Sequence, residues 1–461
     1  MESKNIRERK ERTGWFREAR FGMFIHWGLY AIPARGEWVR SVERIPHEDY
    51  LKFFGEFSAK EYNPREWARL AKKAGMKYAV LTAKHHDGFC LWNTKLTDFS
   101  AANTPAGRDL VKEFLDAFRA EGIRVGLYYS IIDWRHPDYP HYGDRQHPMR
   151  DNPACGNEKR NFGRYLEFMH GQVRELLTGY GKLDIMWFDF SYTDANNDMR
   201  GAKWKAQELI DMVRSIQPHL IIDNRLEGSG EHSGTILSAN PSDFAGDFAC
   251  PEQMIPPRGI TNERGDPVPW EACITLNNHW GYCAEDKHWK PADMIIRMLA
   301  ECVSKNGNLL LNVGPDAKGR IPAASVEILE KVGRWMADNG ESIYGCYAAD
   351  GCHTADGCHA ADDNGIAGYE KPEWGRYTQK GNKLYAHVLE SQTGAICLSK
   401  LSGKIEKMRL LSDGSEIKSG AEHWNLTEYP EDEFFFLNPA SFDNYPLPDP
   451  ADTVVEITLK R

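Results

Sequence analysis

The sequence predicts an α/β protein: a closed (β/α)8 barrel of the TIM type followed by a C-terminal antiparallel β-sandwich. From about residue 20 to residue 315, eight short apolar runs alternate with longer amphipathic stretches, which is the pattern of right-handed βαβ units. After about residue 345 the pattern changes to short alternating segments separated by turn residues. The 461 residues suffice for one large and one smaller domain, which we expect at residues 1–345 and 346–461.

Each barrel strand is expected where a short apolar run ends in polar or turn residues. Eight parallel strands within roughly 300 residues favour a closed barrel, and an open doubly wound sheet is the alternative. The runs are 21–28, 77–83, 123–132, 183–190, 220–225, 247–250, 272–278 and 308–315.

The stretches between these runs are amphipathic and long enough for helices. Each would cover the outside of the barrel and return the chain to start the next parallel strand. The helices are expected within 67–76, 109–122, 165–181, 205–218, 291–307 and 325–340.

The last 110 or so residues favour an all-β sandwich, because short alternating segments are separated by Gly, Asn, Asp and Pro. The domain boundary is expected in the loop AADGCHTADG. The strand candidates are 383–390, 394–401, 407–413, 433–439 and 453–460.

Composition excludes several classes of protein. Hydrophobic residues make up 41% and charged residues 27%, which is typical of a globular chain. A net charge of −10 without a basic stripe argues against nucleic acid as a partner. The first residues are charged and lack an apolar core, and no apolar run approaches the roughly 20 residues of a membrane span. We therefore expect no membrane partner and a cytoplasmic location.

The cysteines favour reduced thiols over a disulfide framework, since ten of them are scattered without a Cys-x-x-Cys pair. One segment repeats a Cys-His pair, at Cys352/His353 and at Cys358/His359. Its spacing is wrong for a zinc finger and it is rich in Ala, Asp and Gly, so a solvated loop is favoured over a metal site.

Polar and aromatic side chains occupy the ends of five successive expected strands. Catalytic groups of a parallel barrel lie at these C-terminal ends, and five in succession are unusual for satisfied core residues. A glutamate, Glu252, follows the sixth strand. The strand ends are His26-Trp27-Gly28, His85-His86-Asp87, Tyr128-Tyr129-Ser130, Trp187-Phe188-Asp189 and Asp223-Asn224-Arg225.

The second strand end, LTAKHHDGF, turns from an apolar run to a lysine and two adjacent histidines. Neighbouring side chains on a strand point to opposite faces. Both histidines can serve one site only if the strand has ended and the chain is turning there. We therefore expect His85 and His86 in a turn.

The residue types favour sugar chemistry, because His, aromatic and carboxylate side chains occur without a Ser/His/Asp elbow, a phosphate-binding Gly-rich loop or a cofactor lysine. Cleaving a glycosidic bond takes two carboxylates. Asp189 is the natural nucleophile, because it ends an apolar strand and Trp187, two positions earlier, points to the same side.

The motifs FGMFIHWGLYAIPARGEWV, KYAVLTAKHHDGFCLW, GRDLV, VGLYYSIIDW, LDIMWFDF, CITLNNHWGY and NGNLLLNVGPDAKGRIP, in this order, resemble those of glycoside hydrolase family 29, the retaining α-L-fucosidases. The resemblance implies a catalytic barrel and a β-sandwich, Asp189 as the residue of the covalent intermediate, a fucosylated oligosaccharide or glycoconjugate as substrate, and no cofactor. The implied fucose-binding residues are His26, Glu37, Trp38, His85, His86, Tyr128, Trp187 and Arg225.

The histidines also admit a metal site. A neutral imidazole offers one donor and one acceptor, which suits a sugar hydroxyl. A single-metal site would require a third ligand, which His26 could supply, but the ion would then neutralise the nucleophilic carboxylate. We therefore expect no metal.

Two departures from the family concern the pocket. The family often has Gly after the nucleophile, where this chain has Phe190. The acid/base has no fixed motif: Glu252 in FACPEQ is favoured, with Glu271, Glu227 and Glu231 as alternatives. Glu271 precedes its strand, at the wrong end of a barrel, and would be a surface or helix-capping carboxylate.

The expected activity is retaining hydrolysis of terminal α-L-fucosyl residues. Asp189 would attack the anomeric carbon while Glu252 protonates the leaving oxygen and later deprotonates water. A glycosidase acting on an L-galactose-like sugar is the first alternative. A non-catalytic sugar-binding protein is the second, and the presence of both carboxylates argues against it.

Overall fold

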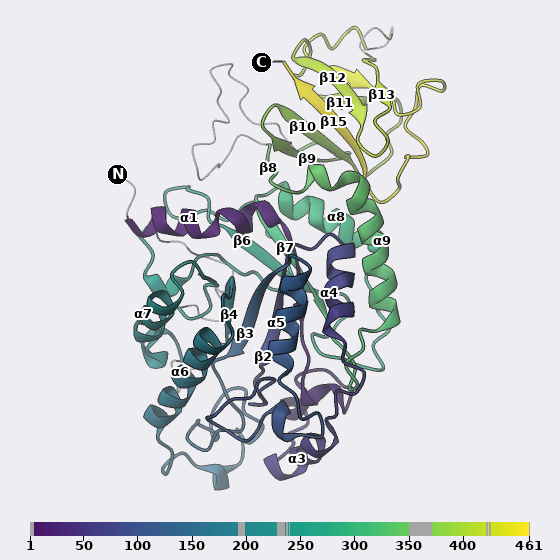
Figure 1. Ribbon diagram of the computed structural model, residues 1–461. Coiled ribbons are helices and arrows are strands. Elements are labelled where there is room, and N and C mark those ends of the chain that lie inside the picture. The colour runs from purple at the N-terminus through teal and green to yellow at the C-terminus, as the bar shows by residue number, and fades with distance from the viewer. Residues whose placement is uncertain are drawn as a thin grey trace.

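The computed structural model describes residues 4–191, 199–227, 236, 238, 240–349, 371–420, 423 and 426–460. Figure 1 shows helices on the outside of a curled sheet, with the C-terminal strands forming a separate layer beyond α8 (Ala292–Val303) and α9 (Ala323–Asn339). The repeated Cys-His segment at 352–359 and Glu231 lie outside the described residues.

The first domain contains a parallel sheet of seven strands in the order β5-β4-β3-β2-β1-β7-β6. Neighbours in the sheet are neighbours in the chain except at β1 and β7, which pair with each other as the two ends of a barrel do. The strands are β1 (Phe21–Ile25), β2 (Tyr78–Lys84), β3 (Arg124–Ser130), β4 (Ile185–Asp189), β5 (Ile221–Ile222), β6 (Trp270–Thr275) and β7 (Gly307–Val313).

Residues 247–252 close the barrel between β5 and β6. Parallel bridges join Asp223 to Phe248 on one side and Ala249 to Trp270 on the other. The expected sixth strand is therefore present only as isolated bridges. Pro251 cannot donate a backbone hydrogen bond, which limits regular pairing here. With this segment the sheet is the predicted eight-membered barrel.

Six helices follow the predicted amphipathic stretches, and α1, α2 and α3 were not predicted. In α5, Asp109 caps the N-terminus by accepting a hydrogen bond from the Lys112 amide at 2.9 Å. The helices are α1 (Lys4–Ala19), α2 (Val39–Val42), α3 (His47–Glu56), α4 (Pro64–Lys73), α5 (Leu110–Ala120), α6 (Phe162–Gly179), α7 (Ala206–Ile216), α8 and α9.

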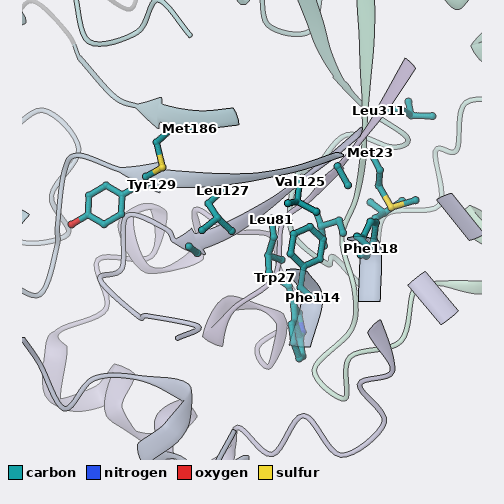
Figure 2. Packing of buried hydrophobic residues seen from close by; sticks show 14 of the residues in the cluster. Met23, Trp27, Leu81, Phe114, Phe118, Val125, Leu127, Tyr129, Met186 and Leu311 are labelled. Atoms are coloured by element: carbon teal, nitrogen blue, oxygen red, sulfur yellow. The ribbon is translucent and has the colours of Figure 1, made fainter. Parts of the chain in front are cut away.

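The main core lies between the barrel and these helices. Figure 2 shows Phe114 and Phe118 of α5 beside Leu81 and Val125 of β2 and β3. Each of the four side chains is buried, and burying one phenylalanine contributes about 1.5–3 kcal/mol. This packing holds the strands whose ends carry the site.

A second apolar cluster fills the barrel itself and forms the floor under the site. It includes Phe24, Tyr128, Trp187 and Cys273, one from each of β1, β3, β4 and β6. At the opposite end, Phe16 of α1 packs against Tyr78, with ring centroids 5.6 Å apart. The barrel is therefore a packed core, open only at the C-terminal ends of its strands.

The C-terminal region is the predicted β-sandwich. A six-stranded antiparallel sheet, in the order β13-β12-β15-β10-β9-β8, shares one apolar core with the pair β11-β14. The strands β8, β9 and β13 were not predicted; in β9 the only large apolar residue is Tyr377. The strands are β8 (Tyr347–Ala348), β9 (Gly375–Lys380), β10 (Lys383–Val388), β11 (Ile396–Leu398), β12 (Ile405–Leu410), β13 (Glu416–Ile417), β14 (Glu433–Phe435) and β15 (Thr453–Leu459).

Specific polar contacts join the sandwich to the barrel helices. Arg297 of α8 donates to the carbonyls of Leu389 and Ala451, at 2.8 and 3.0 Å. The indole of Trp335 on α9 donates to the carbonyl of Asp452 at 2.9 Å.

Among the described residues, no helix has the length and apolar character needed to cross a membrane. The eight cysteines in the described part of the chain are free thiols.

Candidate active site

A pocket opens at the C-terminal ends of the barrel strands. The space between its lining side chains is about 360 Å³ when the open solvent at the mouth is included. Nine of the ten predicted site residues line it, and Glu37 does not. The lining residues are Phe24, His26, Trp38, His85, His86, Tyr128, Trp187, Asp189, Phe190, Arg225, Glu252, Cys273 and Trp280.

Asp189 ends β4 and is held from both sides. The Tyr128 hydroxyl donates to its Oδ2 at 2.6 Å, and Arg225 Nη1 donates to its Oδ1 at 3.1 Å. Burial raises the pKa of Asp189 to about 6; the Arg225 charge lowers it and the Glu252 charge adds to the rise. The carboxylate is therefore ionised at neutral pH and fixed in orientation.

Arg225 joins the two predicted catalytic carboxylates. The same Nη1 atom lies 2.9 Å from Glu252 Oε2, so the contacting oxygens of Asp189 and Glu252 are within about 6 Å, compatible with the about 5–5.5 Å of retaining glycosidases. The guanidinium also lies 4.6 Å from the centre of the Trp187 ring. The Glu252 side chain is 41% exposed and that of Asp189 11%, so Glu252 lies at the mouth and Asp189 inside.

His86 has a defined tautomer. The hydroxyl of Ser130 donates to the carbonyl of Ile132 at 2.9 Å, so it accepts from His86 Nδ1, 2.7 Å away. The unprotonated Nε2 then faces Asp189 Oδ2 at 3.8 Å. Burial, followed by the charges of His26, Lys84 and Arg225, holds the pKa of His86 well below its usual value.

His26 is oriented in the same way. Its Nδ1 lies 2.7 Å from Asn312 Oδ1, and the Asn312 amide donates to the carbonyl of Trp280 at 2.7 Å. This leaves His26 Nε2 as an acceptor, and burial lowers the pKa of His26 to about 3. His85 stacks on Tyr128, with centroids 5.6 Å apart, and burial lowers its pKa well below the usual value. The pocket therefore holds three neutral imidazoles.

The backbone of β2 explains why adjacent histidines serve one pocket. The pairing with β3 shifts between Thr82 and Lys84, which is a β-bulge. The Gly88 amide then donates to the His85 carbonyl at 3.1 Å, and Gly88 has a φ of 81°, which favours glycine. The expected turn after the strand is confirmed.

Trp38 lies in the pocket wall, whereas Glu37 lies behind it. The Trp38 ring packs on His86 and Phe190, with centroids 5.1 and 5.6 Å away. Glu37 Oε2 accepts a hydrogen bond from the Gly281 amide at 2.7 Å. Glu37 therefore holds the loop that carries Trp280.

The other strand-end polar residues support the pocket without lining it. Ser130 orients His86, as described above. Asp87 accepts from the Tyr50 hydroxyl at 2.9 Å. Asp223 accepts from the Phe188 amide at 2.9 Å and so joins β5 to β4 just before Asp189.

The structure separates the acid/base alternatives. Glu271 is fully buried under the pocket and accepts from the Tyr78 hydroxyl at 2.5 Å and from the Trp187 indole at 3.3 Å. The expectation of a surface or helix-capping carboxylate was wrong, because these two donors fix Glu271 inside the barrel. Burial raises the pKa of Glu271 to about 7. Glu227 is exposed and accepts from the Ser242 hydroxyl at 3.1 Å.

Four lining residues were not predicted as site residues. Phe24 lies two positions before His26 on β1, so the alternation of strand side chains could have indicated it. Trp280 belongs to the motif CITLNNHWGY, and Cys273 is buried in β6. Phe190 has a φ of 92°, a conformation that disfavours any side chain.

Within the described ranges, no three His, Cys, Asp or Glu side chains form a group that could hold a metal ion.

Comparisons with known proteins agree with this geometry. The family model of the α-L-fucosidases matches residues 2–341. The α-L-fucosidase of Dictyostelium discoideum is 28% identical over 361 residues, covering 72% of this chain and 71% of that protein. The tissue α-L-fucosidase of Bos taurus is 30% identical, covering 72% and 68%.

Solved structures extend the similarity to the C-terminal domain. α-L-Fucosidase isoenzyme 1 from Paenibacillus thiaminolyticus is 56% identical with a TM-score of 0.89, covering 98% of this chain and all of that one. A trapped covalent intermediate of the α-L-fucosidase from Bacteroides thetaiotaomicron, obtained with 2-fluoro-fucosyl fluoride, is 27% identical with a TM-score of 0.76, covering 100% and 97%. The chain therefore belongs to the α-L-fucosidase family, glycoside hydrolase family 29.

Proposed function

We propose that this chain is a retaining exo-α-L-fucosidase in which Asp189 is the nucleophile and Glu252 the general acid/base. The observation that carries the assignment is the shared contact of Arg225 Nη1 with both carboxylates, at 3.1 and 2.9 Å. This contact holds the two carboxylates close together, with Asp189 enclosed in the pocket and Glu252 exposed at its mouth. Two steps through a covalent intermediate need this arrangement.

In the first step, Asp189 attacks the anomeric carbon of the bound sugar. Its Oδ2 is held by Tyr128 and its Oδ1 by Arg225, so the carboxylate is oriented before the substrate arrives. Glu252, at the pocket mouth, gives a proton to the leaving oxygen, and the aglycone departs into solvent. The bond formed is an ester between the sugar and Asp189.

In the second step, water reaches the anomeric carbon from the side that the aglycone has left. Glu252 takes a proton from this water, the ester breaks, and Asp189 is restored as a carboxylate. Two inversions leave the released sugar with the α configuration. Each proton passes through Glu252, and this chain's own side chains supply every group that the two steps require.

The sugar itself is recognised by polar and aromatic groups on different sides of the pocket. The Nε2 atoms of His26 and His86 accept hydrogen bonds from sugar hydroxyls, because each Nδ1 is already donating. The rings of Phe24, Trp187 and Trp280 offer apolar surface to C–H groups. A 6-deoxy sugar, with three free hydroxyls and a methyl group when bound as a glycoside, suits such a divided surface.

The alternative substrate, an L-galactoside, differs from a fucoside by one hydroxyl on C6. Placing that hydroxyl against Phe24 and Trp280 would bury it without a partner, which costs about 1–3 kcal/mol. We therefore expect kcat/KM for an aryl α-L-galactoside to be about 10- to 100-fold lower than for the fucoside. Equal values would favour the alternative.

The assignment is tested by trapping the intermediate. 2-Fluoro-fucosyl fluoride should label one residue of the parent enzyme, and mass spectrometry of the peptides should place the label on Asp189. NMR of a fresh reaction should show α-fucose before mutarotation. A label on Glu252, or β-fucose as the first product, would overturn the roles. The covalent intermediate of the Bacteroides thetaiotaomicron relative was trapped in a glutamate-to-glutamine mutant, which supports a glutamate as the acid/base.

We propose a fucosylated oligosaccharide or glycoconjugate as the substrate. The terminal sugar would lie against Asp189 inside the pocket, and the remainder of the substrate would lie outside the mouth beside the exposed Glu252. A cytoplasmic location stays a prediction from the sequence.

A further inference from the structure

Lys84 is a charged residue of the LTAKHHDGF segment that the mechanism does not use. It ends β2, immediately before His85, and its side chain is fully buried. Its Nζ lies 4.4 Å from the centre of the Tyr129 ring and 6.0 Å from that of Tyr165 on α6. The side chain therefore points away from the pocket, into the layer between the sheet and α6.

The partner of Lys84 is Asp133, in the loop after β3. Lys84 Nζ lies 3.2 Å from Asp133 Oδ2, and the Asp133 side chain is 3% exposed. Asp133 Oδ1 accepts from the amides of Arg135 and His136, at 2.9 and 2.8 Å. Burial raises the pKa of Asp133, and the Lys84 charge is the largest of the opposing effects. Together these opposing effects hold the pKa of Asp133 below its usual value. The ion pair thus joins the end of β2 to the loop after β3.

This loop lies directly behind His86. The Trp134 amide donates to the His86 carbonyl at 2.7 Å, and the two rings are 5.3 Å apart. The turn after His86 also fits closely against Asp133: a Cβ atom on Gly88 would lie 2.5 Å from Asp133 Oδ1. The backbone of His86 is therefore enclosed by residues that the ion pair holds in place.

We propose that Lys84 and Asp133 are positioning residues, whose buried ion pair fixes the turn that presents His86 Nε2 to the sugar. The inference rests on the proposed role of His86 as a sugar-binding residue. Removing both charges with side chains of similar size is often tolerated by a fold. Loss of function in such a double variant would therefore report positioning rather than stability.

The charge of Lys84 also acts on the imidazole. The titratable and charged groups around His86 are His26, His85, Tyr128, Asp189 and Arg225 on the pocket side and Lys84 behind the strand. Burial is the largest cause of its low pKa, and Lys84 and Arg225 add to it. Without Lys84 the pKa of His86 should rise, and without Asp133 it should not.

The experiment compares the double variant Lys84→Met/Asp133→Asn with the parent enzyme and with Lys305→Met. Lys305 lies before β7, at the opposite end of the barrel, and pairs with Glu301. The measurements are the melting temperature, kcat/KM on an aryl fucoside, and ¹⁵N NMR of histidine-labelled protein, with the His86 signals assigned through His86→Gln.

The double variant should melt within a few degrees of the parent, lose about tenfold or more in kcat/KM, and show changed His86 signals. Lys305→Met should keep the parent kcat/KM and His86 signals. A double variant with the parent kcat/KM and His86 signals would overturn the proposal.

Two further variants keep the test decisive. If the double variant does not fold, Asp133→Glu, which keeps the charge and displaces the carboxylate, should still lose several-fold in kcat/KM without any rise in the His86 pKa; parent values for it would overturn the proposal. His86→Gln tests the proposed role of His86 itself. Parent activity in His86→Gln would reject that role, whereas altered His86 signals in the double variant would still report positioning.

Discussion

Two regions of the molecule each bury a histidine beside an aspartate. In the pocket, His86 Nε2 lies 3.8 Å from Asp189 Oδ2. In the sandwich, His387 Nδ1 lies 2.7 Å from Asp452 Oδ2, and His387 Nε2 lies 3.1 Å from the hydroxyl of Thr378. By residue type the second group resembles a catalytic triad more closely than the first does.

The difference lies in which atoms remain available. The Thr378 hydroxyl also lies 2.7 Å from the Ser342 carbonyl, and Thr378, His387 and Asp452 are all completely buried. In the pocket, the described residues hydrogen-bond His86 at Nδ1, and its Nε2, in a ring that lines the cavity, lies 3.8 Å from Asp189 Oδ2. A site therefore requires fixed groups with unused donors or acceptors at a cavity, and the sandwich group is structural. The predictions below test this contrast, beginning with the largest effect.

Asp189→Ala should lower kcat/KM on an aryl fucoside by about 10⁴-fold or more, because the variant has no nucleophile. Added azide should restore part of the turnover by entering the vacated space. Asp452→Asn is the matched control: it should lower the melting temperature and keep kcat/KM within about twofold. Near-parent activity in Asp189→Ala would mean that the pocket group, like the group in the sandwich, is not catalytic.

Glu252→Ala should lower hydrolysis of fucosides with poor leaving groups by about 10²- to 10⁴-fold, because their departure requires a proton. Fucosides of acidic phenols should still form the intermediate, and azide should speed its breakdown. Glu271→Gln should destabilise the barrel without this dependence on the leaving group. The reverse result for the two variants would move the acid/base role to Glu271.

His86→Ala should lose about 1.5–3 kcal/mol of transition-state stabilisation, roughly 10- to 150-fold in kcat/KM, if it leaves a buried sugar hydroxyl unpaired. His387→Ala should instead cost about 3 kcal/mol or more in the free energy of unfolding, since Asp452 loses its buried partner. Its kcat/KM at a permissive temperature should be unchanged.

Chelators should not affect the activity of the parent enzyme. Inactivation by a chelator that zinc reverses would favour the metal interpretation of the pocket histidines.

The pH dependence should follow Asp189. Its pKa is raised to about 6, so kcat/KM should fall as the pH decreases through about 6 and the nucleophile is protonated. Glu252→Gln removes a negative neighbour that raises this pKa, so the acidic limb should move to lower pH. The measurement uses fucosyl fluoride, whose leaving group needs little protonation. Glu227→Gln, at an exposed site after β5, should leave the limb in place.

Phe190 should show the smallest effect. A left-handed backbone costs a residue with a side chain about 1–2 kcal/mol, partly offset by the greater freedom of unfolded glycine. Phe190→Gly should therefore be more stable than Phe190→Ala by about 0.5–1 kcal/mol in urea unfolding, while both lose the contacts with His86 and Trp38. Lys400→Gly, at a φ of 59° in the sandwich, should be stabilised or neutral with parent activity. If Phe190→Ala were more stable than Phe190→Gly, the backbone at residue 190 would not be strained.

The order of strands and helices was determined by the sequence itself. Apolar runs alternate with amphipathic stretches because each strand must be buried on both faces and each helix on one. The same pattern placed His26, Tyr128 and Asp189 at strand ends, and the ends of parallel strands meet at one edge. These predictions depend only on local periodicity and on the geometry of a parallel barrel.

Features held by distant contacts could not be predicted. Helix α1 is mostly charged, and it is held by Arg12, whose guanidinium lies 2.8 Å from Asp247, and by Phe16 under the barrel. The burial of Glu271 follows from two donors, Tyr78 and Trp187, that lie 193 and 84 residues away in the chain.

The choice among similar groups was also made by the tertiary structure. His387 follows the apolar run Leu384–Ala386 inside a strand, and the sequence alone does not show that both of its ring nitrogens contact the protein. Whether a side chain faces a cavity depends on which segments close around it, and those segments are remote in sequence. Local pattern therefore determined which residues stand at strand ends, and packing decided which of their atoms stay available to a substrate.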